Sequence, residues 1–350
     1  MAKPDFSIII VTWNALHHLK TFLPSVWEHS GQHCEIIIAD NASTDGTRDW
    51  VCENYHDIRV VTYEKNFGYC GGNNRAVPHA RSNHLIFLNN DVEVTSGWTD
   101  PFKRIFTENQ DVAAVQPKMI SWKDRRFFEY AGAAGGLLDR FAYPFCRGRI
   151  FDTLETDDGQ YDREADISWV SGAAFAIRKE LFEQCGGFDE TFEFHMEEID
   201  LCWQLSNRGY RMRYTPDSVV FHLGGGSLPG ASPRKLYYNY RNNLKMIWKN
   251  SAPGCLTPRL TGRLMLDAIA IGRSLSGLKL KECFAIIRGH LHFYRSLPML
   301  TKQRKYLASQ RVTTDDTRVL APWSIIWHYF FRKRKTYQQL PVLEIDRQSD

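Results

Sequence analysis

The chain has 350 residues, of which 43% are hydrophobic, 24% charged and 13% aromatic, so it can bury a large core and is not a disordered chain. Its 8 cysteines include no Cys-x-x-Cys pair, which argues against a zinc ribbon or a dithiol redox motif and favours a reduced, cytoplasmic protein. The net charge of +4 is uneven, because residues 255–350 hold 17 Lys and Arg against 7 Asp and Glu, whereas residues 1–254 hold 27 against 33.

The N-terminal residues lack the features of a targeting segment. Residues 1–5 offer no basic stretch that leads into an apolar run and a cleavage site, so we expect no secretory signal. No apolar run approaches the roughly 18 residues that span a bilayer. The positive charge of the C-terminal region predicts that this region faces an anionic partner, either a membrane surface or nucleic acid.

Four short apolar runs recur in the first third of the chain, and each precedes a polar turn and a segment long enough for a helix. They are residues 6–12, 35–40, 59–63 and 84–89. Their near-continuous hydrophobicity is typical of parallel strands that are covered on both faces. The pattern predicts an α/β nucleotide-binding fold, in which ligands bind beyond the carboxyl ends of the strands.

Two polar segments follow the second and third predicted strands. Residues 40–47 hold several side-chain oxygens where helix capping needs only one or two, so this segment favours ligand binding over capping alone. Residues 66–74 combine three glycines with three asparagines, and glycine lets a backbone approach a ligand closely. A purely structural turn is an equal alternative for this second segment.

The fourth predicted strand ends in Asn89-Asn90-Asp91, which places one carboxylate and two amides at the mouth of the sheet. Oxygen ligands of this kind suit a hard divalent cation that also contacts a diphosphate. A polar strand end without a ligand is the alternative.

The middle of the chain changes character. Residues 121–166 mix aromatic, glycine and acidic positions, which predicts a long connection or a small subdomain. After this region the sequence predicts regular elements again, namely a strand at 167–177, a helix at 179–185, a helix at 198–208 and a strand at 219–222.

Three carboxylates surround the start of the helix predicted at 198–208. Glu197, Glu198 and Asp200 follow His195. Acidic residues are common at helix N-termini, where they complement the helix dipole. A carboxylate there can also act as a general base toward a substrate hydroxyl.

The C-terminal region predicts basic helices. Residues 264–297 mix apolar and basic side chains, and an aromatic run at 323–331 leads into Arg332-Lys333-Arg334-Lys335. This combination is typical of an element that lies in the interface of an anionic membrane. Helices that pack on the body of the protein, or across a homodimer, are the alternative.

Taken in order, these segments resemble an inverting family 2 glycosyltransferase of the GT-A fold, close to the bacterial rhamnosyltransferase-like members. The resemblance covers residues 5–250. It is carried by Val11-Thr12-Trp13-Asn14, Asp40-Asn41-Ala42-Ser43-Thr44-Asp45-Gly46-Thr47, residues 66–74, Leu88-Asn89-Asn90-Asp91, Ser171-Gly172-Ala173 with Arg178, Gly187-Phe188-Asp189-Glu190, and Glu197-Glu198-Ile199-Asp200-Leu201. Each motif is weak by itself, but the ordered set is specific.

The resemblance implies a binding site for a sugar nucleotide. It assigns the nucleoside to Thr12, Asn14, Asp40 and Ser43. It assigns the diphosphate and ribose to Asn66 and the turn that follows, with Gly68, Gly72 and Asn73.

The resemblance also implies a divalent cation, Mg²⁺ or Mn²⁺. Asn89 replaces the first aspartate of an Asp-x-Asp metal motif and Asp91 is its last residue, so the metal would be held chiefly by Asp91 and the diphosphate. His222 matches a position where many GT-A enzymes place a histidine near the metal or diphosphate. A structural histidine at a strand end is the alternative.

The catalytic base of the family is the second residue of a Glu-Asp pair, which corresponds to Glu198 in a Glu-Glu pair here, with Glu197 as the second candidate. Trp169, Gly172 and Ala173 resemble the segment that forms the floor of the acceptor and donor-sugar site. A core aromatic is the alternative for Trp169.

We therefore expect a metal-dependent inverting glycosyltransferase that moves a sugar from dTDP-rhamnose or a UDP-sugar to a hydroxyl of a glycan or lipid-linked glycan, in bacterial cell-surface polysaccharide synthesis. The expected architecture is an α/β GT-A domain at 1–250, Rossmann-like with a mostly parallel central sheet and flanking helices. Residues 1–120 would form its nucleotide-binding half and 121–250 its acceptor half, and 251–350 a basic helical extension.

A non-catalytic nucleotide- or carbohydrate-binding scaffold at the membrane is the alternative function. A nucleotidyltransferase or a dehydrogenase would need a glycine-rich loop after the first strand, and Thr12-Trp13-Asn14-Ala15-Leu16 contains no glycine and no lysine. The basic region lacks a recognised nucleic-acid module, so we expect no nucleic-acid partner. We expect a cytoplasmic location, peripheral on the inner face of the cytoplasmic membrane.

Overall fold

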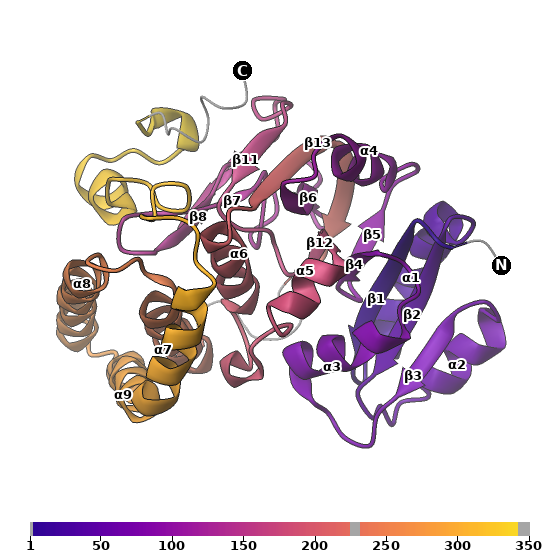
Figure 1. The fold of residues 1–350 in the computed structure, drawn as a ribbon, viewed down its shortest axis with the longest axis horizontal. Helices are drawn as coiled ribbons and strands as arrows, with labels where there is room; N and C mark the ends of the chain where they lie inside the picture. The colour runs from indigo at the N-terminus through magenta and orange to yellow at the C-terminus, as the bar shows by residue number, and fades with distance from the viewer. Residues whose placement is uncertain (1–2, 225–231, 342–350) are drawn as a thin grey trace.

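The computed structural model describes residues 3–224 and 232–341, and the predicted α/β fold is confirmed in it. Within these residues a nine-stranded sheet forms the centre of the molecule, in the order β11-β13-β6-β12-β4-β1-β2-β3, with β5 paired to β13 (Figure 1). A separate four-stranded sheet has the order β10-β9-β8-β7.

The strands of the described residues are β1 (Phe6–Thr12), β2 (Cys34–Asp40), β3 (Arg59–Thr62), β4 (His84–Leu88), β5 (Val92–Val94), β6 (Val112–Ser121), β7 (Gly136–Leu138), β8 (Pro144–Cys146), β9 (Arg149–Ile150), β10 (Thr153–Leu154), β11 (Ala165–Ile167), β12 (Ala174–Arg178) and β13 (Arg211–His222). The α-helices are α1 (Leu16–Ser30), α2 (Thr47–Asn54), α3 (Gly68–Ala76), α4 (Asp100–Glu108), α5 (Lys179–Gln184), α6 (Glu197–Asn207), α7 (Pro233–Asn250), α8 (Leu256–Ser276) and α9 (Leu280–Ser309).

The first four predicted strands are confirmed, and they are parallel. β1 lies between β2 and β4, and β3 extends the sheet beyond β2. Alternate side chains of β1 enter two different cores, Ile8 and Ile10 with Leu19 of α1 on one face, and Ile9 with Cys70 of α3 on the other. Because both faces are covered, the strand is hydrophobic at nearly every position.

The other half of the central sheet is mixed. β12 lies antiparallel between β4 and β6, and β13 is parallel to β6 but antiparallel to β5 and β11. The single strand predicted at 167–177 was wrong, because β11 ends at Ile167 and β12 begins at Ala174. Between them the backbone is held by side chains instead, since Ser171 N–H donates to Gln116 Oε1 at 2.8 Å and the Gly172 carbonyl accepts from Tyr69 Oη at 2.7 Å.

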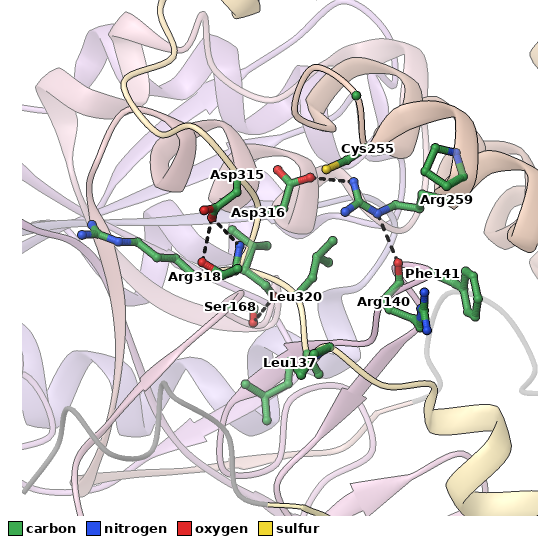
Figure 2. A pocket seen from close by; sticks show the side chains of 16 residues that line it. Leu137, Arg140, Phe141, Ser168, Cys255, Arg259, Asp315, Asp316, Arg318 and Leu320 are labelled. Carbon is green, nitrogen blue, oxygen red and sulfur yellow. Dashed lines mark hydrogen bonds and ion pairs between the residues drawn. The ribbon is translucent and has the colours of Figure 1, made fainter.

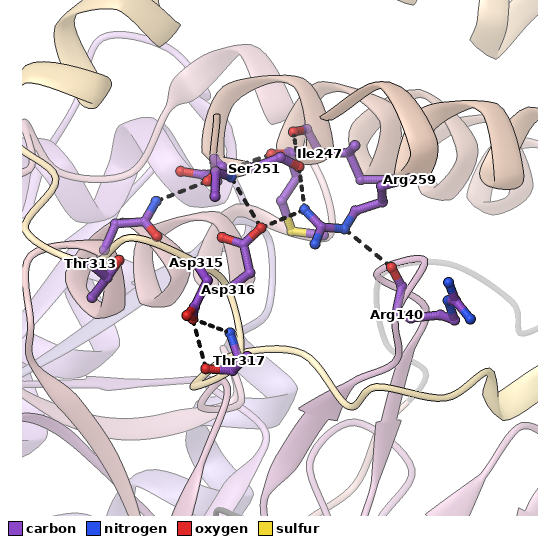
Figure 3. A network of polar contacts seen from close by, with 12 residues as sticks. Arg140, Ile247, Ser251, Arg259, Thr313, Asp315, Asp316 and Thr317 are labelled. Carbon is purple, nitrogen blue, oxygen red and sulfur yellow. Dashed lines mark hydrogen bonds and ion pairs between the residues drawn. The ribbon is translucent and has the colours of Figure 1, made fainter. Parts of the chain in front are cut away.

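Residues 136–154 form the small antiparallel sheet, and the chain beyond α9 returns to cover it. Ile325 and Tyr329 pack with Phe145 and Ile150 in a core of their own. The returning segment is also held by ion pairs (Figure 3). Arg259 of α8 lies 2.6 Å from Asp316 and donates through Nε to the Arg140 carbonyl at 3.2 Å.

α7, α8 and α9 gather at one end of the molecule, opposite the parallel strands β1 to β3 (Figure 1). Leu244 of α7 packs with Phe293 and Leu300 of α9 in a shared cluster. The predicted helical C-terminal region is therefore present, although it changes to irregular chain after Ser309. None of the helices in the described residues has the length and apolar character that crossing a membrane requires.

Candidate active site

The turns after β1 and β2 are joined to each other by hydrogen bonds. The Asn14 N–H donates to Ser43 Oγ at 2.9 Å, and the Ser43 N–H donates to Asp40 Oδ1 at 3.0 Å. Asn14 Oδ1 also accepts from the Thr44 N–H at 2.7 Å. Asn14 has a φ of 48°, a left-handed conformation that asparagine tolerates. Three of the four residues assigned to the nucleoside thus form one network at the carboxyl ends of neighbouring strands.

The turn before α3 contains residues with different surroundings. Asn66 Oδ1 accepts from the Gly68 N–H at 2.8 Å. Apart from the chain neighbours of Gly68 and the backbone of its own helix, no described residue has an atom within 4 Å of the place where a Cβ of Gly68 would be. A Cβ on Gly72 would lie 2.8 Å from Val11 Cγ1, and Asn73 is buried with its amide bonded within α3. Gly68 therefore lies at the open side of the turn, whereas Gly72 and Asn73 pack against the sheet.

The end of β4 is brought against the end of β13. Asn90 Nδ2 donates to Thr12 Oγ1 at 3.2 Å, and Asp91 Oδ1 lies 3.1 Å from His222 Nε2. The pairing of β5 with β13 places Val92 opposite His222 and fixes this contact. Asp91 and His222, which are 131 positions apart in the chain, thus share one buried corner of the site.

Glu129 completes this corner. Its Oε1 lies 3.3 Å from His222 Nδ1, so the imidazole stands between two carboxylates. Burial alone would lower the pKa of His222, but Glu129 and Asp91 outweigh it and raise the pKa to about 10. His222 therefore carries a proton between the two acids, and a metal cation bound there would take the place of that proton.

The side chains of this corner supply only some of the ligands that a divalent cation needs. No group of three or more His, Cys, Asp or Glu is placed to hold a metal within residues 3–224 and 232–341. The 3.1 Å between Asp91 Oδ1 and His222 Nε2 is nevertheless close to the separation of two adjacent ligands with bonds of about 2.1 Å. Glu129 on the second ring nitrogen is the support that metal-bound histidines commonly have. The two residues thus suit an ion whose other ligands come from a bound diphosphate.

The start of α6 is a strained backbone that presents carboxylates. Glu193, His195 and Met196 all have positive φ, at 63°, 66° and 75°, and α6 begins at Glu197. Such conformations are costly for residues other than glycine and cluster at functional sites. Asp200, by contrast, is buried and lies 2.7 Å from Lys249 Nζ, so it anchors the helix rather than facing a substrate.

Glu197 and Glu198 each keep one carboxylate oxygen, Oε2, that is buried without a hydrogen-bond partner in the described part of the chain. Burial raises the pKa of Glu198 to about 7. Burial and the charge of Glu198 raise the pKa of Glu197 well above its usual value. A carboxylate with a pKa near neutrality can both ionise and accept a proton at physiological pH.

The irregular segment between β11 and β12 connects this carboxylate pair to the metal corner. A Cβ on Gly172 would lie 3.8 Å from Glu198 Cδ and 3.5 Å from Tyr69 Oη. The next residue, Ala173, accepts a hydrogen bond from the Asn89 N–H at 2.8 Å. The structure therefore brings Glu198, Gly172, Ala173 and the segment that ends in Asp91 into one continuous site.

Trp169 takes a different place. It is buried, and its Nε1–H donates to the Leu137 carbonyl at 2.9 Å, which is the core position named as its alternative. Sequence reasoning missed Glu129 and Tyr69 as parts of the site. Glu129 stands in no distinctive motif, and Tyr69 lies in the turn at 66–74 without a feature of its own. Only the fold places these side chains beside His222 and Gly172.

A cavity of about 580 Å³ lies elsewhere, between the loop at Arg140, the start of α8 and residues 315–322 (Figure 2). None of the site residues assigned above is among the described residues that line it. Its Arg259 and Asp316 neutralise each other at 2.6 Å. This cavity is therefore separate from the candidate active site.

Comparisons with known proteins identify the family of the chain. The sequence model described as "Glycosyl transferase family 2" matches residues 7–186. The chain is 26% identical, over 61% of its length and 75% of the relative's, to the N-acetylglucosaminyl-diphospho-decaprenol L-rhamnosyltransferase of Mycobacterium tuberculosis. It is 22% identical to the dTDP-rhamnosyl transferase RfbF of Shigella flexneri, over 72% of this chain and 82% of that protein.

Solved structures share the fold at low sequence identity. S. aureus TarS 1-349 in complex with UDP has a TM-score of 0.55 at 17% identity, over 97% of this chain and 95% of that TarS chain. The mannosyltransferase PcManGT from Pyrobaculum calidifontis, in complex with GDP-Man and Mn²⁺, has a TM-score of 0.51 at 18% identity, over 89% of this chain and 86% of PcManGT. The family match covers more than half of the chain, so the chain belongs to glycosyl transferase family 2 and is a glycosyltransferase with a GT-A fold.

Proposed function

We propose that the protein is a metal-dependent inverting glycosyltransferase that transfers a sugar from a nucleoside-diphosphate sugar to a hydroxyl of a glycan or lipid-linked glycan. The observation that supports this most strongly is the position of Glu198. One of its buried oxygens has no hydrogen-bond partner among the described residues, and its carboxyl group lies against Gly172. Through Ala173 and Asn89 the same segment leads to Asp91.

The reaction forms a bond from the acceptor oxygen to the anomeric carbon and breaks the bond from that carbon to the diphosphate oxygen. Glu198 accepts the proton of the acceptor hydroxyl, a role worth typically ~10²–10⁴-fold in rate. Attack on the face opposite the leaving diphosphate inverts the anomeric centre. Asp91 and His222 would hold Mg²⁺ or Mn²⁺, which neutralises the charge on the leaving diphosphate when bound.

The relatives support the choice of donor and acceptor. Two of them are named as rhamnosyltransferases, one of these with dTDP in its name, which favours dTDP-rhamnose. The fold shared with UDP-bound TarS keeps a UDP-sugar as the second candidate donor. The name of the mycobacterial relative contains a diphospho-decaprenol, which favours a lipid-linked glycan as acceptor and a place in bacterial cell-surface polysaccharide synthesis.

A panel of sugar nucleotides tests this proposal, with release of nucleoside diphosphate measured with Mn²⁺, with Mg²⁺ and with EDTA. We expect release from one donor class only, lost with EDTA and in Glu198→Gln, and retained in Glu53→Gln, which changes an exposed glutamate of α2. Donor binding without release from any donor and acceptor pair would favour the non-catalytic scaffold.

We further propose that the enzyme attaches peripherally to the inner face of the cytoplasmic membrane through α8 and α9. The outward surface of these helices, called the outer face below, exposes many large apolar side chains. They are Met265, Ile269, Leu275, Leu278, Leu280, Phe284, Ile287 and Leu291, of which Leu278 is 85% exposed. Exposed basic residues lie among them, namely Arg273, Lys279, Lys281, Arg288 and Arg295.

The opposite side of α9 packs on the body of the protein. Packing on the body and attachment to a membrane, the two alternatives drawn from the sequence, are therefore compatible. Phe293 and Leu300 are buried against α7, whereas Phe284 and Leu291 face outward. Arg273 also lies 5.9 Å from the ring of Phe330, which joins the outer face to the aromatic and basic segment near the end of the chain. Apolar residues flanked by cations match the interface of an anionic leaflet in both hydrophobicity and charge.

A further inference from the structure

Arg149 is a buried cation without a matching anion. It is 8% exposed in β9, and its closest polar contact is from Nη2 to Cys146 Sγ at 3.4 Å. Among residues 3–224 and 232–341 its Nε has no hydrogen-bond partner and no carboxylate forms an ion pair with it, so Glu129 acts on it only at longer range. A guanidinium that is desolvated in this way is costly unless an anion binds to it.

Arg149 shares an aromatic ring with a second cation. The Arg149 Cζ lies 4.6 Å from the centre of the Tyr130 ring, and Lys235 Nζ lies 5.1 Å from the same centre. Tyr130 is 43% exposed, so the ring reaches solvent between the two charges. Burial and the charge of Arg149 lower the pKa of Lys235, and Glu129 opposes them only in part.

Lys235 lies in the first turn of α7, and this adds to the positive potential. The helix has 18 residues, begins after the cap Ser232, and has no acidic side chain in its first turn. A helix N-terminus of this length favours anions, and here the buried Arg149 provides an independent feature of an anion site.

This cluster borders the metal corner through Glu129 but shares none of its residues with it. Glu129, the residue before Tyr130, contacts His222 Nδ1, whereas Asp91 contacts His222 Nε2. The charge of Glu129 also acts on both Arg149 and Lys235, so the cluster lies on the Glu129 side of the imidazole ring. The small antiparallel sheet and α7 supply the cations, and neither element contains a residue assigned to the donor.

We propose that Arg149, Lys235 and Tyr130 form a second anion subsite, which binds a phosphate group of the acceptor while the ring of Tyr130 contacts its sugar or lipid. The inference rests on the proposed function and adds the acceptor class, a phosphate-bearing carrier such as a lipid-linked diphosphate sugar. A neutral glycan acceptor would leave Arg149 buried without a counter-charge.

Binding of geranyl diphosphate to the full chain, saturated with the nucleoside diphosphate of the preferred donor and Mn²⁺, tests the subsite by calorimetry. We expect Arg149→Gln and Lys235→Gln to weaken this binding about tenfold or more. Arg48→Gln, at an exposed arginine of α2, is the matched control and should bind as the wild type does. Because Arg149 is buried, Arg149→Lys and the unfolding midpoint of each variant separate a lost charge from a lost fold.

The affinity of the same variants for nucleoside diphosphate shows whether the two cations bind a phosphate of the acceptor or the diphosphate of the donor. Unchanged affinity supports an acceptor subsite, whereas an equal loss for nucleoside diphosphate and geranyl diphosphate assigns the cations to the donor and overturns the proposal. Absence of geranyl diphosphate binding to the wild type also overturns it. Binding of geranyl diphosphate needs no turnover, so it can also be measured in Glu198→Gln. A failure of the catalytic proposal is therefore distinguishable from a failure of this one.

Discussion

Glu198 and Glu197 share the start of α6, but only Glu198 lies against Gly172 in the observed contacts. We expect Glu198→Gln to lower kcat by about 10²–10⁴-fold, because the amide keeps the shape of the side chain but cannot accept the proton. Glu197→Gln should have a milder effect, and both should leave donor affinity nearly intact. Steady-state kinetics with calorimetry checks this, and a larger loss in Glu197→Gln would assign the base to Glu197.

The raised pKa of Glu198 also predicts how its replacement changes stability with pH. Below the ordinary pKa of 4.5 the carboxyl is neutral in both folded and unfolded chains, so wild type and Glu198→Gln should be equally stable. As the pH rises from 4.5 to the folded pKa of about 7, the unfolded chain ionises this carboxyl before the folded chain does, so the free energy of unfolding of the wild type falls. The variant should then be more stable, by up to about 3 kcal/mol.

Urea unfolding at pH 5 and pH 8 measures this difference, with Glu53→Gln as the exposed control. A gain for Glu198→Gln that is the same at both pH values would contradict a raised pKa for this carboxyl group.

Asp91 is the only carboxylate in Asn89-Asn90-Asp91. We therefore expect Asp91→Ala to abolish the part of nucleoside-diphosphate affinity that depends on Mn²⁺ or Mg²⁺, while the metal-independent part remains. Calorimetry with and without Mn²⁺ measures both parts. Metal-dependent affinity equal to that of the wild type would remove Asp91 from the metal site.

At the scale of elements, α6 is fixed to α7 by a buried cation. Lys249 Nζ lies 2.7 Å from both Asp189 and Asp200, and Asn250 Nδ2 donates to Asp200 at 2.7 Å. Lys249→Met should lower the free energy of unfolding by about 3–5 kcal/mol, because Asp200 would remain buried without its counter-charge. Urea unfolding measures the loss, and the exposed Lys123→Met serves as control. An effect no larger than that of the control would show that the pair does not anchor α6.

The sequence predicted those elements whose signals are local. Strands such as β1 are continuous apolar runs because both faces are covered, and their bounds followed from that pattern. The segment after Ile167 looked like one strand because it is apolar. It is interrupted by hydrogen bonds with two side chains from distant positions, Gln116, which accepts, and Tyr69, which donates. Long-range side-chain contacts of this kind leave no local pattern.

Across the whole molecule, the site too contains residues that the sequence marks and residues that only the fold brings together. The motifs at Asp91 and Glu198 could be found in the sequence, because the family resemblance marks them. Glu129 and Tyr130 lie in irregular chain and Arg149 in the two-residue strand β9, and only the folded chain brings them beside His222 and α7. Their chemistry could not be inferred from spacing.

The membrane proposal concerns the whole molecule and calls for point substitutions in the full chain. Removal of α9 would expose Leu244 and the rest of the cluster it shares with Phe293, so truncation would confuse binding with unfolding. We expect the double substitution of Phe284→Ser with Leu291→Ser to reduce sedimentation with anionic vesicles strongly. Lys281→Gln with Arg288→Gln should reduce it about tenfold or more, at about 1 kcal/mol for each charge.

Trp27→Ser, at a 45% exposed residue of α1 at the other end of the molecule, is the control for this experiment. Vesicles of phosphatidylglycerol and phosphatidylcholine, at low and high salt, separate the charge contribution from the apolar one. Equal sedimentation of all variants would contradict attachment through the outer face and favour contact between copies of the chain.

The most direct test of the central claim is the anomeric configuration of the product. Proton NMR of a reaction with the donor selected by the panel, followed from its first minutes, shows whether the transferred sugar has changed configuration. Direct attack by an acceptor hydroxyl deprotonated by Glu198 predicts an inverted anomeric centre in the wild type and almost no product in Glu198→Gln. A product that keeps the configuration of the donor would contradict the assignment of Glu198 as the base of an inverting reaction.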